Sequence, residues 1–507
     1  MSKQRLRLAV LPALLASAGV AYPLSAQAGG DAPAQTYDVV IANGRVMDPE
    51  SGRDEIANVG INGRGIAIIT TAKLKGRRTI DATNLVVAPG FVDLHAHGQN
   101  PKGEYYQVLD GVTTAIDAEG GAMPIAPFIA ALSGKALVNF GATASHQCAR
   151  REVIANAPCQ GHGAINPDGG SSDRRAYTAP ATPEQQRAIV AALDREVAAG
   201  ALGYGLGIEY TPGAGRSEIY DIFKAAAVTR APVFVHVRSR PLDPAPGVPI
   251  AVVQEVIANA AVTGAPLQIV HLHSTGLRDT PTLIDMVKRA RQRGLDITSE
   301  AYPYTAGSTH IGSEFFRDGW QERSGISFGD LQWPATGERL TKESFERYRR
   351  EQPNAAVVVH MIPEDVVDAI IAEPEISIAS DGMPWVTSGE HPRGAGTYGR
   401  VLGRYVRERK TLGLMAALRK MALMPAQRLE AVSPQMARKG RVKVGADADI
   451  TIFDPATVAD VATFEKPMQA SVGIRHVLVN GQPVVRDGKL VEGVFPGEAI
   501  TGTAKAR

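Results

Sequence analysis

Two histidines one residue apart, His95 and His97, follow an apolar run at residues 88–94. Residues i and i+2 of an extended strand point to the same side, so both imidazoles can reach one metal ion. Several runs of this kind, each ending on a side chain that binds metal, indicate a metallohydrolase. The other three strand-like runs end on His236, His271 and Asp381.

The segments that must position these side chains alternate between strand and helix patterns. Apolar strand-like runs are followed by segments with helical periodicity, and Thr182 is a candidate N-cap for one of them. Repeated strand–helix units favour a parallel sheet with right-handed crossovers. The predicted helices lie at 183–199, 217–229, 250–262, 280–293 and 363–372.

A closed barrel explains the placement of the metal-binding side chains better than an open sheet does. The carboxyl ends of barrel strands meet on one face, where barrel enzymes place their active sites. An open doubly wound sheet would distribute the same side chains along one edge. We therefore predict an α/β fold with a (β/α)8 TIM-type barrel over residues 88–431.

One segment of this barrel region, at about 310–350, breaks the alternation of strand and helix. It contains Phe315, Phe316, Trp320 and Trp333. We predict that this insertion forms a lid over the barrel mouth. The alternative is a surface elaboration with no part in binding.

Both flanks of the barrel region are rich in short strands. Alternating apolar residues and turn residues fill 36–87, and the same pattern recurs at 432–507. We expect the two segments to form one small β-sandwich domain assembled from both termini.

The first 28 residues have the composition of a secretory signal peptide. Lys3, Arg5 and Arg7 precede an apolar stretch at 8–21, and residues 26–28 form an Ala-x-Ala cleavage site. The apolar stretch is short for a membrane span, which needs about 20 residues. We therefore expect cleavage, export to the periplasm and no membrane span in the mature chain.

The balance of charges argues against a nucleic-acid partner. The chain has 54 basic and 52 acidic residues, and the predicted signal peptide removes three basic residues and no acidic ones. Binding to nucleic acid needs clustered basic charge, which a nearly neutral chain lacks. The two cysteines, Cys148 and Cys159, could form a disulfide in an oxidising compartment or remain small buried apolar residues.

Several motifs together carry a family resemblance. Segments 89–97, 380–382 and 445–450 are general features, whereas 301–309 (AYPYTAGST) and 391–405 (HPRGAGTYGRVLGRY) are longer and more distinctive. By these motifs the chain resembles the amidohydrolase superfamily and, within it, the D-aminoacylase (N-acyl-D-amino-acid deacylase) family. The resemblance covers nearly all of the mature chain.

The resemblance implies a metal centre with two positions. His95 and His97 would hold one position, and His236 and His271 the other. Asp381 would act as the catalytic general base and could also bind metal directly in the resting state. The implied metal is Zn²⁺, which activates a water molecule for attack on the amide.

Glu119 departs from the pattern of the family. D-aminoacylases have a cysteine at this position, after the second strand. A carboxylate offers two hard oxygen donors and can bridge two ions, whereas a thiolate favours a single zinc ion. We therefore predict Glu119 as a metal ligand and favour two zinc ions per chain over one.

The resemblance also implies a clamp for the α-carboxylate of the substrate. Arg393 could bind it through two parallel hydrogen bonds, and Tyr302 and Ser308 could add hydroxyl donors. The lysine that normally assists is replaced here by His273, which is only partly charged at neutral pH. The carboxylate is then held less tightly, or the preferred substrate differs.

These inferences predict an exported, metal-dependent amidohydrolase that cleaves N-acyl-D-amino acids to a carboxylate and a free D-amino acid. One alternative is a dipeptidase that acts on dipeptides with a C-terminal D-residue. A second is a cyclic-amide hydrolase of the dihydroorotase or hydantoinase type, although residues 200–210 lack the lysine such enzymes usually carboxylate. A third is a non-catalytic binding protein on a barrel scaffold. The substrate would be a small molecule, and the sequence leaves the oligomeric state open.

Overall fold

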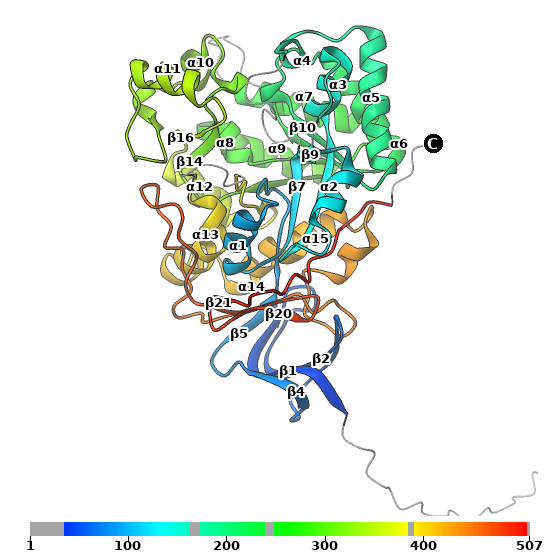
Figure 1. The fold of residues 1–507 in the computed structure, drawn as a ribbon, viewed down its shortest axis with the longest axis vertical. Helices are drawn as coiled ribbons and strands as arrows, with labels where there is room; N and C mark the ends of the chain where they lie inside the picture. Colours follow the sequence, from blue (N-terminus) through cyan, green and yellow to red (C-terminus); the bar gives the residue numbers. More distant parts are fainter. Residues whose placement is uncertain (1–34, 160, 163–172, 239–247, 384–389, 504–507) are drawn as a thin grey trace, which may run out of the picture. The chain divides into compact units, whose positions relative to one another are not determined.

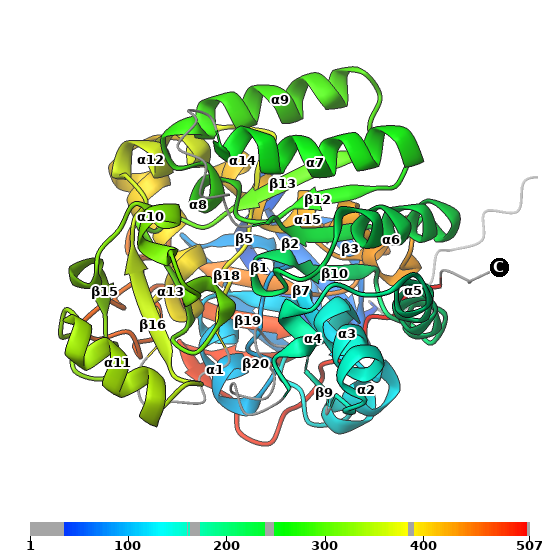
Figure 2. The ribbon, with the colours of Figure 1, turned by 90° about the horizontal axis from the view of Figure 1, so that it is seen from above.

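Eight parallel strands form a barrel and follow one another in chain order around it (Figure 2). A parallel bridge between Ala96 and Gly382, which lie just beyond the first and last strands, brings the two ends of the sheet together. The (β/α)8 prediction is therefore confirmed. The strands are β6 (Phe91–Asp93), β7 (Val112–Met123), β8 (Asn139–Ser145), β10 (Tyr204–Gly207), β11 (Val233–His236), β12 (Leu267–Ile269), β13 (Ile297–Ala301) and β17 (Ser377–Ile378).

The computed structural model describes residues 35–159, 161–162, 173–238, 248–383 and 390–503. The chain from Thr36 onward forms one compact unit. The predicted signal peptide lies outside the described residues. Among the helices that are described, none has both the length and the apolar character needed to cross a membrane.

Helices cover the outside of the barrel, and α5, α6, α7 and α9 pack side by side in that order (Figure 2). Thr182 caps α5 as predicted. Its hydroxyl oxygen accepts a hydrogen bond from the Gln185 backbone amide, and the Gln185 side-chain oxygen accepts one from the Thr182 backbone amide. The five predicted helices begin and end within two residues of their expected limits. They are α5 (Pro183–Ala198), α6 (Arg216–Thr229), α7 (Val248–Thr263), α9 (Thr280–Gln292) and α12 (Glu364–Ala372).

Shorter helices connect the strands or close the loops above and below them. These helices are α1 (Pro101–Leu109), α2 (Ile125–Leu132), α3 (His146–Ala155), α4 (Arg175–Thr178), α8 (Leu272–Gly276), α13 (Arg393–Arg400), α14 (Leu414–Leu418) and α15 (Met424–Leu429).

A disulfide joins Cys148 in α3 to Cys159, so the structure selects one of the two alternatives that the sequence left open. Shortly after Cys159, the two-residue strand β9 (Gly161–His162) pairs with the end of β7.

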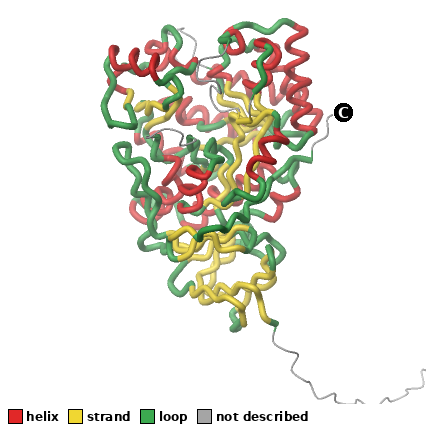
Figure 3. Tube along the Cα trace, viewed as in Figure 1, coloured by secondary structure: helices red, strands yellow, loops and turns green. Residues whose placement is uncertain are grey.

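The two β-rich flanks meet in one nine-stranded sheet, seen as blue and red strands together in Figure 1 and as yellow strands in Figure 3. Antiparallel pairing of β18 with β5 joins the halves, and the sheet has its own apolar cluster. A β domain assembled from both termini is confirmed, whereas its limits at residues 87 and 432 stay predictions. The strands are β1 (Thr36–Asp48), β2 (Arg53–Asn62), β3 (Gly65–Thr70), β4 (Lys75–Asp81), β5 (Val86–Pro89), β18 (Ile450–Phe453), β19 (Ile474–Val479), β20 (Gln482–Arg486) and β21 (Lys489–Leu490).

The insertion forms a small α/β unit after β13. Its antiparallel strands β14 (Ala306–His310), β16 (Ala356–His360) and β15 (Leu331–Gln332) carry the helices α10 (Trp320–Ser324) and α11 (Lys342–Glu351). Phe316, Trp320, Trp333 and Phe345 belong to a separate apolar cluster. Most of the aromatic residues that marked the insertion in the sequence therefore form a core of their own.

A buried polar network joins the β domain to the amino-terminal end of the barrel. Lys439 Nζ lies 3.1 Å from Asp447 Oδ2 and 2.6 Å from Asp449 Oδ2. Asn139, the first residue of β8, donates to Asp449 at 3.1 Å and accepts from Asn480 at 2.8 Å. Because all five side chains are buried, each depends on the others to offset its lost hydration.

Removing the cation from this network should destabilise the fold. We expect Lys439→Met to lower the free energy of unfolding by about 3–5 kcal/mol, because Asp449 would be buried without a cation. Denaturant unfolding followed by circular dichroism measures the loss. Lys443→Met is the control, because Lys443 pairs with Glu50 at the surface and should cost less than about 1 kcal/mol. Equal losses in the two variants would show that the buried network is unimportant.

Candidate active site

Every predicted metal ligand lies at the carboxyl end of a barrel strand, and all of them gather at one place. Their nitrogen and oxygen atoms form two groups, and within each group all atoms lie within 4.8 Å of one another. Glu119 is the one residue common to both groups. The first group is His95, His97, Glu119 and Asp381, and the second is Glu119, His236 and His271.

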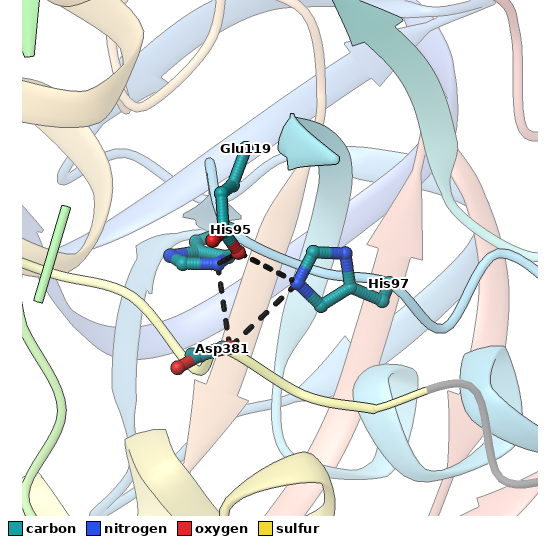
Figure 4. Close-up of side chains that lie close together, drawn as sticks. All are labelled: His95, His97, Glu119 and Asp381. Carbon is teal, nitrogen blue, oxygen red and sulfur yellow. Dashed lines mark hydrogen bonds and ion pairs between the residues drawn. The ribbon is translucent and has the colours of Figure 1, made fainter. Parts of the chain in front are cut away.

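The first group has the spacing of a four-donor metal site (Figure 4). His95 Nε2 lies 2.7 Å from Glu119 Oε2 and 3.3 Å from Asp381 Oδ1. His97 Nε2 lies 3.2 and 3.7 Å from the same two oxygens. Donors bound tetrahedrally to zinc at about 2.0–2.1 Å stand roughly 3.3 Å apart. The side chains present therefore fit a divalent ion.

The second group uses the other oxygen of the shared carboxylate. Glu119 Oε1 lies 2.7 Å from His236 Nδ1, and His271 Nε2 lies 3.2 Å from the same nitrogen. Each oxygen of Glu119 thus faces a different pair of histidines. This is the arrangement that a carboxylate bridging two ions requires.

Glu119 is aimed by an irregularity in β7. This strand pairs with β8 in regular register as far as Asp117, and the register then shifts. Asp117 Oδ1 accepts the amides of Gly120 and Gly121, both at 3.0 Å. Gly121 has φ 68°, and a Cβ there would lie 2.5 Å from the Thr143 carbonyl oxygen. Local irregularities of this kind re-aim a side chain, and here the side chain is that of Glu119.

Two of the predicted metal ligands have a disfavoured backbone conformation. His271 has φ 31° and Asp381 has φ 52°, both in the left-handed region that non-glycine residues rarely adopt. Such conformations cost on the order of 1–3 kcal/mol each and persist where the surroundings fix them. Next to Asp381, Ser380 Oγ accepts the Gly382 amide and Asp93 Oδ1 accepts the Ser380 amide, both at 3.0 Å.

Two further carboxylates, which the sequence analysis missed, contact the Nδ1 atoms of His95 and His97, on the side of each ring that faces away from the site. His95 Nδ1 lies 2.6 Å from Glu300 Oε1, and His97 Nδ1 lies 3.1 Å from Asp117 Oδ1. Glu300 lies one residue before the end of β13, so its place near a strand end was a signal that could have found it. These contacts orient the two rings with Nε2 toward the site.

Negative charge dominates the electrostatics of the first group. Burial disfavours a charged imidazole, but Asp381, Glu300 and Glu119 outweigh it and raise the pKa of His95 well above its ordinary value. Burial would also raise the pKa of the Asp381 carboxyl, but Arg393 and His95 hold this pKa well below its usual range. The site is therefore a concentration of carboxylates that a bound cation would neutralise.

The predicted carboxylate clamp lines the cavity that leads to these atoms. Arg393, Tyr302 and Ser308 all lie on its wall, together with Asp381, His236 and His271. Arg393 Nη1 lies 2.7 Å from Asp381 Oδ2, and the guanidinium stacks 4.8 Å from the centre of the Tyr302 ring. The structure thus places the clamp beside the predicted general base.

His273 does not occupy its predicted place. It is absent from the described residues that line the cavity, and its ring packs edge-on behind Tyr302 with centroids 4.5 Å apart. Burial lowers the pKa of His273 to about 3, so the ring is neutral and supplies no charge to a substrate carboxylate. Strand β12 ends at Ile269 and α8 begins at Leu272, so residues 271 and 273 do not share one face of a strand.

One wall of the cavity is formed by the insertion, whose side chains lie outside the barrel. Its lining contains the apolar side chains Phe315, Trp320, Val359 and Met361 and the polar side chains Arg323 and Ser324. This supports the predicted role of the insertion at the barrel mouth over a surface elaboration without a part in binding. The cavity therefore combines a polar end, which carries the metal ligands and Arg393, with a largely apolar wall that also contains Arg323 and Ser324.

A parallel barrel with two clustered donor sets at the mouth of its strands is the arrangement of a metal-dependent hydrolase. The chain belongs to the amidohydrolase family, whose pattern matches residues 167–485. It is 32% identical to an N-acyl-D-glutamate deacylase of Alcaligenes xylosoxydans xylosoxydans, over 88% of this chain and 93% of that protein. It is 30% identical to a D-aminoacylase of the same organism, over 93% of this chain and 99% of that protein.

Solved structures give the same result. An N-acyl-D-glutamate deacylase from Bordetella bronchiseptica, complexed with zinc and a phosphonate inhibitor, superposes with a TM-score of 0.75 at 26% identity, over 92% of this chain and all of that one. A D-aminoacylase superposes with a TM-score of 0.74 at 25% identity, over 92% and 99% of the two chains. Hydantoinases, at 17% identity and TM-scores of 0.56 to 0.59, share the fold.

Proposed function

We propose that this protein hydrolyses the amide bond of N-acyl-D-amino acids to release a carboxylate and a free D-amino acid. The observation that carries the proposal is the position of Arg393, which contacts Asp381 at 2.7 Å on the wall of the metal-binding cavity. In an N-acyl amino acid the carbon next to the scissile nitrogen bears the α-carboxylate. A clamp for that carboxylate must therefore stand beside the hydrolytic centre. The names of the two deacylases described above support the same substrate class and the D configuration.

The proposed cofactor is Zn²⁺, with two ions per chain, and Glu119 would contribute to both positions. Bound zinc would polarise the amide carbonyl and lower the pKa of a water molecule to about 7. Asp381 would accept the proton of the attacking water and deliver it to the leaving amine. Arg393, with Tyr302 and Ser308, would fix the α-carboxylate so that the scissile bond faces Asp381. Support for two ions comes from the two oxygens of Glu119, which face different pairs of histidines.

Substrate preference can be measured with matched N-acetyl-D- and N-acetyl-L-amino acids. We expect a D-to-L ratio in kcat/KM of at least about 100, which corresponds to roughly 2.7 kcal/mol of transition-state discrimination. Leucine, methionine and phenylalanine derivatives should exceed aspartate and glutamate derivatives, because Phe315, Trp320, Val359 and Met361 make one wall apolar. Equal rates for the two configurations would refute the D assignment. Turnover of dipeptides with a C-terminal D-residue alone would establish the dipeptidase alternative.

The role of Asp381 is tested by Asp381→Asn. We expect kcat to fall by about 10²- to 10⁴-fold, because an amide cannot accept the proton of water. Circular dichroism should show a folded protein, and zinc content measured on the same sample separates loss of the base from loss of a metal ligand. The control is Asp368→Asn on the outer helix α12, where the carboxylate pairs with Arg409 at 2.5 Å, and its activity should equal that of the wild type. Substantial turnover by Asp381→Asn would exclude the base role.

We further propose that the protein is exported to the periplasm. The basic, apolar and Ala-x-Ala segments of residues 1–28 support this, and the Cys148–Cys159 disulfide is suited to an oxidising compartment. Mass spectrometry of the protein from a periplasmic fraction should give a mature chain that begins at Gly29. An intact amino terminus confined to the cytoplasmic fraction would overturn the proposal.

A further inference from the structure

We propose that the cavity contains a subsite for an acyl group that bears a negative charge, and that Arg323 of the insertion binds this charge. The preferred substrates are then D-amino acids acylated by a dicarboxylic acid, for example with a succinyl or glutaryl group. Water adds to the acyl carbonyl, the C–N bond breaks, and the products are the dicarboxylate and the free D-amino acid. This inference rests on the proposed function and names the acyl group that the same site accepts.

The carboxylate clamp and the fourth barrel strand lie on opposite sides of the cavity. Arg393 contacts Asp381, which follows the eighth strand β17, and stacks on Tyr302, which follows the seventh strand β13. Glu209 lies on the cavity wall just after the fourth strand β10. Since half of the barrel separates β10 from β17, Glu209 lies across the mouth from the clamp.

A substrate bound at the clamp directs its acyl chain toward Glu209. An amide is planar and trans, so the acyl chain and the α-carbon extend from the C–N bond in opposite directions. With the α-carboxylate on Arg393, the acyl chain points to the wall that follows β10 and β11. The amino-acid side chain stays on the clamp side, where Val359 pairs with Gly307 next to Ser308. The apolar preference proposed above therefore concerns that side chain and leaves the acyl group open.

The insertion holds Arg323 on the side of the cavity that follows β10. One face of α10 carries Trp320, Arg323 and Ser324, at positions i, i+3 and i+4, and all three line the cavity. The Arg323 guanidinium donates to the main-chain oxygen of Arg317 at 2.9 Å. Arg317 in turn contacts Glu209 Oε1 at 3.4 Å. These contacts tie α10 to the wall that the acyl chain approaches.

Arg323 has hydrogen-bond donors left for a ligand. A guanidinium has five N–H donors, and the contacts of Arg323 with main-chain oxygens use two of them. Among the residues that the structure describes, no carboxylate forms an ion pair with Arg323. Arg238, the other arginine on this side of the cavity, differs. It donates twice to Glu255, at 2.9 and 3.2 Å, and once to the Ala214 oxygen at 2.8 Å.

The charges on this wall favour an anion over a cation. Glu209 contributes one negative charge and Arg317 and Arg323 two positive charges, which leaves one positive charge in excess. Burial and the neighbouring Arg317 lower the pKa of the Arg323 guanidinium, as expected of a cation without a close counter-ion. Asp318 and Glu322 are exposed and outside the described lining of the cavity, so water screens their charges. A substrate carboxylate supplies the missing negative charge, whereas the ammonium group of a dipeptide is repelled.

The test compares N-succinyl-D-leucine with N-succinamyl-D-leucine, in which a neutral amide replaces the terminal carboxylate of the acyl group. With the zinc-loaded protein we expect kcat/KM to be at least about tenfold higher for the succinyl compound at low ionic strength. Added salt should reduce this ratio. Equal values for the two compounds would overturn the inference. So would a higher kcat/KM for glycyl-D-leucine, whose acyl group bears an ammonium, than for N-acetyl-D-leucine.

Arginine variants of the insertion identify the residue responsible. Arg323→Met should abolish the difference between the succinyl and succinamyl compounds, and Arg323→Lys, which keeps the charge, should retain it. If Arg323→Met does not fold, Arg323→Gln takes its place, because it removes the charge and keeps donors for the main-chain oxygens. An unchanged ratio in the neutral variant would overturn the inference.

The matched control is Arg349→Met in α11. Arg349 also donates to a main-chain oxygen of the insertion, that of Phe316 at 2.7 Å, but it is outside the described lining of the cavity. Its ratio for the two compounds should equal that of the wild type. A loss in Arg323→Met that is selective for N-acetyl-D-glutamate over N-succinyl-D-leucine would place the charge at the amino-acid side chain and overturn the inference.

Calorimetric titration with the same two compounds does not depend on turnover. Tighter binding of the succinyl compound that is lost in Arg323→Met, by a protein that hydrolyses neither compound, would refute the proposed function and leave the subsite intact. Hydrolysis of N-acetyl-D-amino acids without any preference for the succinyl group would do the reverse.

Discussion

The buried carboxylate of Glu119 is the group on which the rest of the site depends. A carboxylate without exposure to water is costly unless cations or donors surround it. The barrel meets this cost by bringing four imidazoles from three strand ends around its two oxygens. The register of β7 shifts after Asp117, and two glycines follow Glu119. This irregularity sets the direction in which the Glu119 side chain points.

The two ends of the barrel divide stability and function. At the amino-terminal end, Lys439 and Asp449 form a fully satisfied polar network that locks the β domain onto β8. At the carboxyl end, His271 and Asp381 hold unfavourable backbone angles, and acidic side chains crowd together. Barrel enzymes commonly separate these tasks. Here the stable end offsets the strain that the functional end retains.

Local patterns predicted the fold and the gathering of the four histidines with Asp381, because both are encoded over short distances, whereas Glu119 was predicted from the family resemblance. A strand of alternating or continuous apolar residues that ends on His or Asp places that residue at the barrel mouth without further information. Glu300 and Asp117 were missed because their role depends on partners from other strands. His273 was assigned from the family resemblance, but the left-handed turn at His271 leads into α8, and the His273 ring packs behind Tyr302 rather than on the cavity wall. The sequence contains no local sign of that turn.

The insertion has one more consequence. Because its aromatic residues pack in a cluster separate from the barrel core, side chains on its inner surface can be exchanged without repacking the strands that carry the ligands. Phe315 is only partly buried against that cluster, yet it faces the cavity. Such a modular wall allows related chains to diverge in the molecules they accept while the reaction chemistry is inherited unchanged.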